Sequence, residues 1–218
     1  LTLRPGHCKG KLRDEKPRLD FMPKKLPTTA RRGGSIEARK QRAAANREAL
    51  LAAARFWFAR EGYAGTSLND IAAEAGVTRG ALYSQFADKR DLFLEVFQQV
   101  LVELNEAAKN QSAGEEGLWN RVEAGYRHYL TLSSERIDYQ NILLIDGPAV
   151  LGWRAWREMQ AKHISPDTIR SLHLLMEASL IVPVDPEPLA NLILACLHDA
   201  ALSIAYSAST TQQRERII

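Results

Sequence analysis

Apolar positions recur at helical spacing along most of the chain. From Arg39 to Glu61 the sequence has no proline or glycine and is rich in Ala, Arg and Leu, which favour helices. Residues at i, i+4, i+7 and i+8 share one face of a helix, and here they are all apolar: Leu50, Ala54, Trp57 and Phe58. Gly62 follows where a helix C-terminus is expected. The pattern therefore predicts a first helix over 39–61.

Two short helices are predicted next. Ser67 followed by Asp70 resembles a capping box with a shortened acid, and Gly76 ends the short helix that it opens. The buried face of that helix is expected to comprise Leu68, Ile71, Ala72 and Ala75. Thr78 can cap a second helix over 79–86, which directs Leu82 and Phe86 inward. A long amphipathic helix is then predicted over 88–109.

The remainder of the chain also has a helical pattern. A polar break over 110–117 is followed by expected helices at about 117–133, 137–146, 149–163, 167–179 and 187–207. No alternating strand pattern is present, so the predicted fold class is all-α. We expect a basic disordered tail over 1–36 because this stretch is rich in Pro, Lys and Arg. A three-helix domain is predicted over 37–87 and a helical bundle over 88–218, with the helix at 88–109 as the connector.

Composition changes the picture chiefly through charge. The hydrophobic content of 45% and charged content of 25% are typical of a soluble globular protein. Residues 1–93 hold 19 Lys/Arg and 10 Asp/Glu, whereas residues 94–218 hold 10 and 16. A basic front and an acidic back indicate that one end faces a polyanion, the alternative being a basic tail on an unrelated domain. The N-terminus lacks an apolar segment of signal-peptide type, so a cytoplasmic protein with no membrane partner is expected.

The two short helices and the turn between them match the geometry of a helix-turn-helix. Gly76 allows the chain to reverse, and the second helix can then place its first turn in the major groove of DNA. Arg79 can donate to base edges or phosphate, and Gly80 permits close backbone approach. The other donors expected near the DNA are Thr78, Tyr83, Ser84, Gln85 and Lys89. These residues predict binding to double-stranded DNA.

The segments 62–67, 70–72, 75–86 and 88–92 together resemble the DNA-binding domain of the tetracycline-repressor (TetR) family. The resemblance covers roughly residues 40–95, and the segment 146–153 is similar to one common in a branch of that family. It implies phosphate contacts by Thr66, Thr78, Tyr83, Gln85 and Lys89, and base contacts by Arg79, Gly80 and Ser84. The sequence departs from the commoner family pattern at Ser84 and Gln85, which affects the expected operator sequence.

The predicted helix at 187–207 is apolar over more than half its circumference, so a second surface of it should be covered. The resemblance implies that it forms half of a four-helix dimer interface, which suits a homodimer on a palindromic operator. Full burial inside one protomer is the alternative. Eight side chains are candidates for lining an effector cavity: Trp119, Tyr126, Tyr129, Trp153, Trp156, His173, Met176 and His198.

The predicted function is a transcription regulator, a repressor that a small-molecule effector releases from its operator. The alternatives are an activator of the same fold and an all-α small-molecule-binding protein without a DNA function. No HExxH, paired Glu-x-x-His or nucleophile motif occurs, so no enzyme activity and no catalytic residues are expected. Cys8 and Cys196 lie far apart and the histidines show no metal spacing, so neither a metal site nor a cofactor is predicted.

Overall fold

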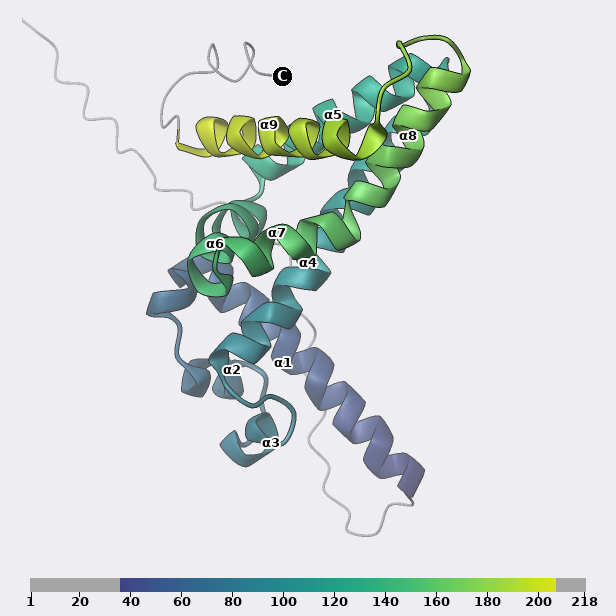
Figure 1. Ribbon diagram of the computed structural model, residues 1–218. Helices are drawn as coiled ribbons and strands as arrows, with labels where there is room; N and C mark the ends of the chain where they lie inside the picture. The colour runs from purple at the N-terminus through teal and green to yellow at the C-terminus, as the bar shows by residue number, and fades with distance from the viewer. Residues whose placement is uncertain (1–35, 207–218) are drawn as a thin grey trace, which may run out of the picture. The chain divides into compact units, whose positions relative to one another are not determined.

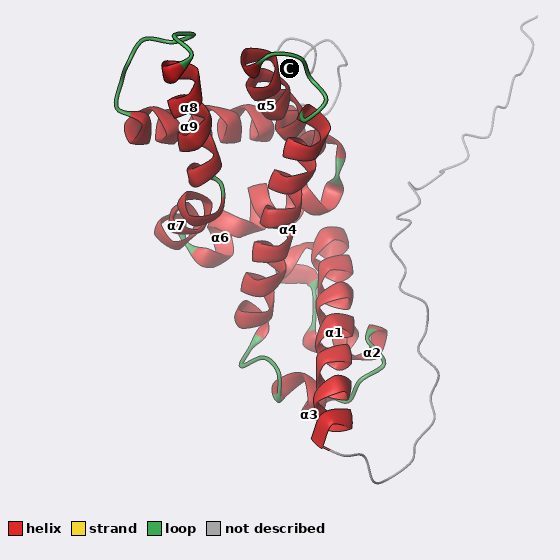
Figure 2. Ribbon diagram, turned by 90° about the vertical axis from the view of Figure 1, so that its right-hand side faces the viewer, coloured by secondary structure: helices red, strands yellow, loops and turns green. Residues whose placement is uncertain are grey.

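The computed structural model describes residues 36–206, and this part of the chain is helical with no strand. The first group of helices comprises α1 (Ile36–Gly65), α2 (Leu68–Glu74) and α3 (Arg79–Tyr83). The long α4 (Lys89–Ser112) leads from this group to α5 (Leu118–Glu135), as Figures 1 and 2 show. The all-α fold class predicted from the sequence is confirmed.

The second half of the described chain packs around α4 and α5. A π-helix, η1 (Tyr139–Asp146), is followed by α6 (Gly147–Leu151), α7 (Trp153–His163), α8 (Ser165–Glu177) and α9 (Pro186–Tyr206). The π-helix lies against α1 and α4, and α9 lies against α5 and α8. Of the predicted tail over 1–36, only Ile36 falls within the described residues, as the first residue of α1. The predicted domain boundaries remain predictions.

The helix α1 is longer than predicted and is kinked near its end. Gly62 has φ of +69°, a left-handed conformation that glycine adopts without a Cβ clash. The kink turns Tyr63 back onto the core, where its ring stacks on Phe58 at 5.8 Å and meets Phe93 edge-on at 5.2 Å. Because Phe58 and Phe93 are fully buried, this aromatic cluster fixes α1 against α4.

Three elements differ from the sequence prediction. The helix predicted over 79–86 ends at Tyr83, and Ser84 is its C-cap residue. The helix predicted over 149–163 is divided into α6 and α7 at Gly152, whose φ of +82° breaks the helical path. The helix predicted over 137–146 is present, but as a π-helix. The other predicted helices are confirmed with ends shifted by a few residues.

Among the described residues, α9 is long and apolar enough to cross a membrane when length and composition alone are considered. This is weak evidence, because core helices of soluble proteins have the same properties. Only 28% of its most apolar window is buried, and Leu192 is 63% exposed. The sequence left open whether this helix is fully buried within one protomer. In the structure it is not.

Gly147, the first residue of α6, occupies a site with no room for a side chain. A Cβ there would lie 2.7 Å from the ring of Phe97, 3.1 Å from the carbonyl oxygen of Ile142 and 3.2 Å from the indole of Trp156. We expect Gly147→Ala to lower the free energy of unfolding by about 1–3 kcal/mol, the usual cost of overpacking a core.

Urea denaturation of purified protein tests this expectation. Gly114→Ala is the matched control, since nothing lies within 4 Å of a Cβ at that exposed loop position. The control should change the free energy of unfolding little or raise it by about 0.4–1 kcal/mol. Equal stabilities for the two variants would contradict the packing argument.

Candidate nucleic-acid interface

Short side-chain caps define α2 and the turn that follows it. The Ser67 hydroxyl accepts a 3.2 Å hydrogen bond from the backbone N–H of Asp70 and donates a 2.6 Å bond to its carboxylate. At the other end Gly76 has φ of +66°, which allows the chain to reverse. Val77 N–H then bonds to the carbonyl of Ala72 at 3.0 Å. The predicted capping pair and glycine turn are both present.

The next helix, α3, begins and ends at hydrogen-bonded side chains. Thr78 caps its N-terminus by accepting a 3.2 Å bond from the N–H of Ala81. Ser84 donates from its hydroxyl to the carbonyl of Ala81 at 2.7 Å. Leu82 is fully buried and Phe86 nearly so, as predicted, and they hold α3 against the remaining helices of the first group. The opposite face of α3 is therefore left at the surface.

That surface carries the hydrogen-bond donors predicted to meet DNA. Thr78, Arg79, Gly80, Tyr83 and Ser84 are all exposed. The Arg79 guanidinium lies 5.6 Å from the centre of the Tyr83 ring and its Nη2 is 3.4 Å from the Tyr83 hydroxyl, so the two side chains share one face. A flat cation beside a phenol can donate to base edges or phosphate oxygens. The structure thus brings five of the eight predicted residues onto one small surface.

Two of the remaining predicted residues flank this surface and are partly buried. Gln85 follows α3 in the turn, and Lys89 is the first residue of α4. The Lys89 Nζ lies 4.4 Å from the centre of the Tyr63 ring, a cation–π contact. Burial lowers the pKa of Lys89, while the nearby carboxylate of Asp146 opposes that shift. Lys89 is therefore held against the ring of Tyr63 at the start of α4.

Thr66 is placed differently from the prediction. It is only 3% exposed, and its hydroxyl donates a 2.7 Å hydrogen bond to the carbonyl of Gly62. In this conformation the side chain cannot donate to a phosphate, so the geometry does not support that role. Thr66 instead closes the kink at the end of α1, before α2 begins. A threonine two residues before a short helix gave no sequence signal for this burial.

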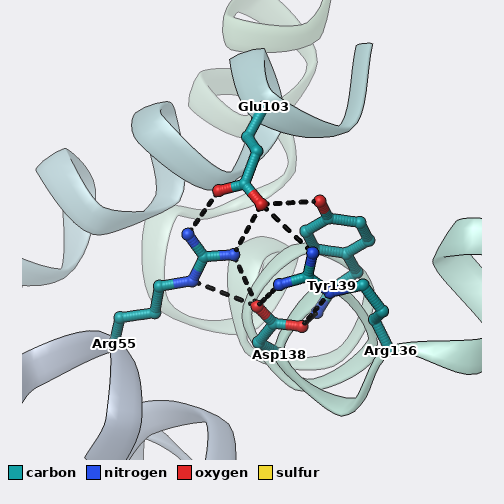
Figure 3. A network of polar contacts seen from close by, with 5 residues as sticks. All are labelled: Arg55, Glu103, Arg136, Asp138 and Tyr139. Atoms are coloured by element: carbon teal, nitrogen blue, oxygen red, sulfur yellow. Dashed lines mark hydrogen bonds and ion pairs between the residues drawn. The ribbon is translucent and has the colours of Figure 1, made fainter. Parts of the chain in front are cut away.

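A partly buried ionic network joins this first group of helices to the rest of the protein (Figure 3). Arg55 of α1 binds the carboxylate of Asp138 at 2.5 Å and that of Glu103 on α4. Arg136 binds Asp138 at 2.7 Å and Glu103 at 3.2 Å, and the Tyr139 hydroxyl donates to Glu103 at 3.0 Å. Two cations therefore face two carboxylates, and the cluster is close to neutral.

The carboxylates of this network are kept ionised by their partners. Burial alone would raise the pKa of Asp138, but hydrogen bonds from Arg136 and Arg55 bring it below its ordinary value. Glu103 behaves in the same way, with Arg55 as the main donor. Because Arg55 and Asp138 have side-chain exposures of only 11% and 10%, their attraction is weakly screened by solvent. The network was not predicted from the sequence.

A second set of contacts links the same two parts of the molecule at the end of η1. The carboxylate of Asp146 accepts a 2.6 Å hydrogen bond from the backbone N–H of Tyr63, next to the kink in α1. Burial raises the pKa of Asp146, and the hydrogen bond and the charge of Lys89 oppose that shift. Nearby, Arg90 of α4 donates to the carbonyls of Val150 and Leu151 at 3.3 and 3.4 Å. The segment 146–151 thus contacts both α1 and α4.

Two neighbouring cavities occur among the helices of the second half. The first, about 330 Å³, lies between α4, α5, α8 and α9 and has both polar and apolar walls. The second, also about 330 Å³, lies between α5, α8, α9 and the loop that joins α8 to α9, and its walls are almost wholly apolar. Cavities of this size in a helical bundle are suited to small organic molecules.

Three of the eight predicted effector contacts line these cavities. Tyr126 borders both, Tyr129 the first and Trp119 the second. The five others do not line either cavity: Trp153, Trp156, His173, Met176 and His198. Trp153 and His173 are exposed, whereas Trp156 and His198 are buried against one another with ring centres 4.2 Å apart. The cavity residues Lys109, Arg121, Asp167 and Arg170 were not predicted, because charged residues near helix ends are usually solvated.

Comparison with known proteins finds that both halves of the chain match tetracycline-repressor-like families. Residues 50–96 match the family described as bacterial regulatory proteins of the tetR family. Residues 119–218 match the tetracyclin repressor-like C-terminal domain. A solved TetR-family transcriptional regulator from Pectobacterium atrosepticum is 32% identical, with a TM-score of 0.70 over 82% of this chain and 91% of that one.

Two curated relatives differ in how much they share with this chain. The TetC protein of transposon Tn10 from Escherichia coli is 24% identical over 147 residues, or 67% of this chain and 73% of that protein. The HTH-type transcriptional repressor BepR of Brucella suis is 47% identical over 57 residues. This last match spans 26% of this chain and 27% of BepR.

Proposed function

This chain belongs to the TetR family of bacterial regulatory proteins, and on that premise we propose that it is a DNA-binding transcriptional repressor that a small molecule releases from its operator. The similarity to BepR favours repression over activation, the alternative raised by the sequence. Binding to DNA is assigned to α3, binding of the effector to the cavity between α4, α5, α8 and α9, and dimerisation to α8 and α9.

The observation that carries the proposal is the exposed face of α3. Arg79, Gly80 and Tyr83 lie together at the surface, and the helix that presents them is capped at both ends and anchored by buried Leu82. A short anchored helix with a donor-rich outer face can enter the major groove. Fluorescence anisotropy with a labelled duplex from the promoter upstream of its own gene tests this, with a scrambled duplex as control. Equal affinity for both duplexes would contradict specific regulation.

We expect Arg79→Ala to weaken binding to the cognate duplex by about 1–3 kcal/mol if the guanidinium contacts a base. The reason is that the substitution removes a bidentate donor without touching the core. Arg154→Ala is the matched control, because Arg154 is an exposed arginine on α7 that pairs with Glu158 of the same helix. It should leave affinity unchanged. If Arg79→Ala weakens cognate and scrambled duplexes equally, Arg79 contacts phosphate instead.

Dimerisation is proposed through the outer faces of α8 and α9. Leu192 of α9 is 63% exposed, and Leu174 of α8, at the edge of the first cavity, is 44% exposed, although both helices belong to the folded bundle. Large apolar side chains at the surface of two adjacent helices are typical of an interface. We expect Leu192→Arg to convert the protein from dimer to monomer, because the interface would then bury two unpaired cations.

Light scattering coupled to gel filtration measures the mass of this variant. Val102→Arg is the control, since Val102 is also an exposed apolar residue but lies on α4. It should remain a dimer. A dimeric Leu192→Arg protein with unchanged dissociation constant would rule out this face.

Release of DNA is proposed to act through the contacts between the two halves. The first cavity has Asn105 and Lys109 of α4 in its wall, and the other end of α4 carries Lys89 and Arg90. Arg90 donates to the carbonyls of Val150 and Leu151 after η1, and the carboxylate of Asp146, at the end of η1, attracts Lys89. An effector that fits the cavity in only one position of α4 would increase the fraction of molecules that have α4 in that position. Adding the effector should lower the fluorescence anisotropy of the labelled duplex, which tests this step.

A further inference from the structure

The two cavities have a common wall, formed by Val122 and Tyr126 of α5. Residues three and four apart on a helix lie on one face, so α5 presents the same stripe to both spaces. From Trp119, in the second cavity, to Tyr129, in the first, α5 rises about 15 Å at the usual 1.5 Å per residue. An elongated molecule lying along α5 would pass from one cavity into the other.

The wall of the first cavity has more cationic than anionic side chains. Its single acid, Asp167, accepts hydrogen bonds from Asn105 at 2.9 Å and from Lys109 at 3.1 Å. Burial alone would raise the pKa of Asp167, but these bonds hold it below its ordinary value, so the carboxylate is ionised and already paired. Lys109 also binds Glu106 at 2.6 Å. Asp167 is therefore not available to a cationic ligand without breaking these bonds.

Two arginines in the same wall are not hydrogen-bonded to a carboxylate among the described residues. Arg170 of α8 only acts on Asp167 at a distance, through its charge, and Arg121 of α5 donates to the backbone carbonyl of Glu115 at 3.4 Å. Guanidinium groups bind carboxylates with two parallel hydrogen bonds, which are stronger than bonds between neutral groups. The first cavity thus offers two donors for an anionic group.

The second cavity offers an apolar surface instead. Its walls include Trp119, Leu172, Leu175 and Ile181. The one charged residue in them is Glu123, which pairs with Arg127 one turn along α5. The buried hydroxyl of Tyr126 lies between the two cavities and has no hydrogen bond of normal geometry. Burial raises its pKa, and the nearby Thr168 opposes that shift. Apolar walls of this kind suit a hydrocarbon chain.

We propose that the effector is an amphipathic organic anion, whose acid group binds Arg121 and Arg170 at the first cavity and whose hydrocarbon chain passes Tyr126 into the second. The inference rests on the proposed function in one respect only: that the ligand of these cavities is the effector. The chemical class follows from the walls themselves. A neutral alcohol of the same length should bind more weakly because it has no charge for the arginines. A quaternary amine should bind more weakly because the two arginines would repel it.

Calorimetric titration of the whole 218-residue chain, without DNA, tests the chemical class of the ligand. Hexanoate, octanoate and decanoate below micelle-forming concentrations should bind with affinity rising about fourfold per added methylene. Decanoate should bind at least about tenfold more tightly than decanol, because charge-assisted hydrogen bonds are lost in the alcohol. Decyltrimethylammonium should bind most weakly. Equal affinities for the three headgroups, or no dependence on chain length, would overturn the proposal.

Substitutions in each cavity test the two ends of the ligand separately. The double variant Arg121→Gln, Arg170→Gln should remove the preference for decanoate over decanol, whereas Arg127→Gln, an exposed arginine of α5 outside both cavities, should keep it. Ile181→Trp should flatten the chain-length dependence by filling the second cavity. Leu180→Trp is its matched control, because Leu180 is the neighbouring exposed residue and lines neither cavity. Thermal melts identify any variant that fails to fold.

The DNA assay keeps the two proposals distinguishable. Decanoate that binds and releases the cognate duplex supports both. Decanoate that binds without releasing the duplex supports the ligand class and contradicts its role as effector. A protein that binds its duplex specifically but no alkyl carboxylate retains the proposed function and loses this inference.

Discussion

Replacing Arg55 by methionine is expected to lower the free energy of unfolding by about 3 kcal/mol at neutral pH, near the lower end of the range for breaking a buried ion pair. Arg55 donates to both carboxylates of the network, and its removal leaves Asp138 largely buried with one cation in place of two. The remaining partner, Arg136, is the reason that the loss should not reach the upper end of the range. Methionine keeps most of the side-chain volume, so the effect isolates charge.

Urea denaturation at fixed protein concentration measures this effect, and two further variants define it. Arg154→Met removes an arginine that is 93% exposed and should cost less than about 0.5 kcal/mol. The double variant Arg55→Met, Asp138→Asn should be more stable than the sum of the two single losses predicts, because neither charge is then left unpaired. Additive losses would show that Arg55 and Asp138 do not interact.

The pH dependence gives a second test of the same network. The pKa of Asp138 is lower in the folded protein than its ordinary value, so its ion pairs stabilise the fold at neutral pH. That contribution is lost as the pH falls through the lowered pKa, where the carboxylate takes up a proton. The stabilities of the wild type and of Arg55→Met should therefore converge in acid. A constant difference at all pH values would point to lost packing.

The helices around the turn could be predicted because their signals are local. Ser67, Gly76 and Thr78 each act on residues within three or four positions, and the structure has all three in the expected roles. At the end of α3 the contact is local too, since the Ser84 hydroxyl donates to the carbonyl of Ala81 three residues earlier. Gly152 was the visible signal for the break between α6 and α7, because a glycine inside a helical pattern often marks a helix end.

The ionic network could not be predicted because its members are far apart in sequence. Arg55 and Asp138 are separated by 83 positions, and Arg55 and Glu103 by 48. One signal was present: Arg55 lies four residues after Leu51 and four before Ala59, both buried, so a charge stands on a buried face. A charge in that position requires a partner, but the sequence does not say which one.

The cavity walls were predicted only in part, for a related reason. Aromatic residues on amphipathic helices can face a cavity or the core, and spacing does not separate the two. Tyr126 and Tyr129 of α5 line the first cavity. Trp156 of α7 instead packs into the core, where its ring contacts that of His198. The wall also depends on Arg121 and Arg170, whose positions follow from how α5 and α8 pack together.

His198 should make the protein less stable as the pH is lowered from about 6.5 toward 4. The imidazole is 7% exposed, its ring meets Trp156, and its Nδ1 lies 3.4 Å from the side-chain nitrogen of Gln160. Burial, with some repulsion from Arg157, lowers its pKa to about 4. The unfolded chain therefore binds a proton near pH 6.5 that the folded protein does not. Linkage then predicts a loss of about 3 kcal/mol across this range.

Comparing the wild type with His198→Gln between pH 4 and 7.5 isolates this loss from the titration of carboxylates. Glutamine is neutral throughout, so the variant can lose some packing at pH 7.5 but should lack the extra decline below pH 6.5. Arg157→Gln should make the decline smaller, because removing the repulsion lets the pKa of His198 rise. Parallel stability curves for the wild type and His198→Gln would mean that the imidazole is protonated as easily in the folded protein as in the unfolded chain, and hence that water reaches it.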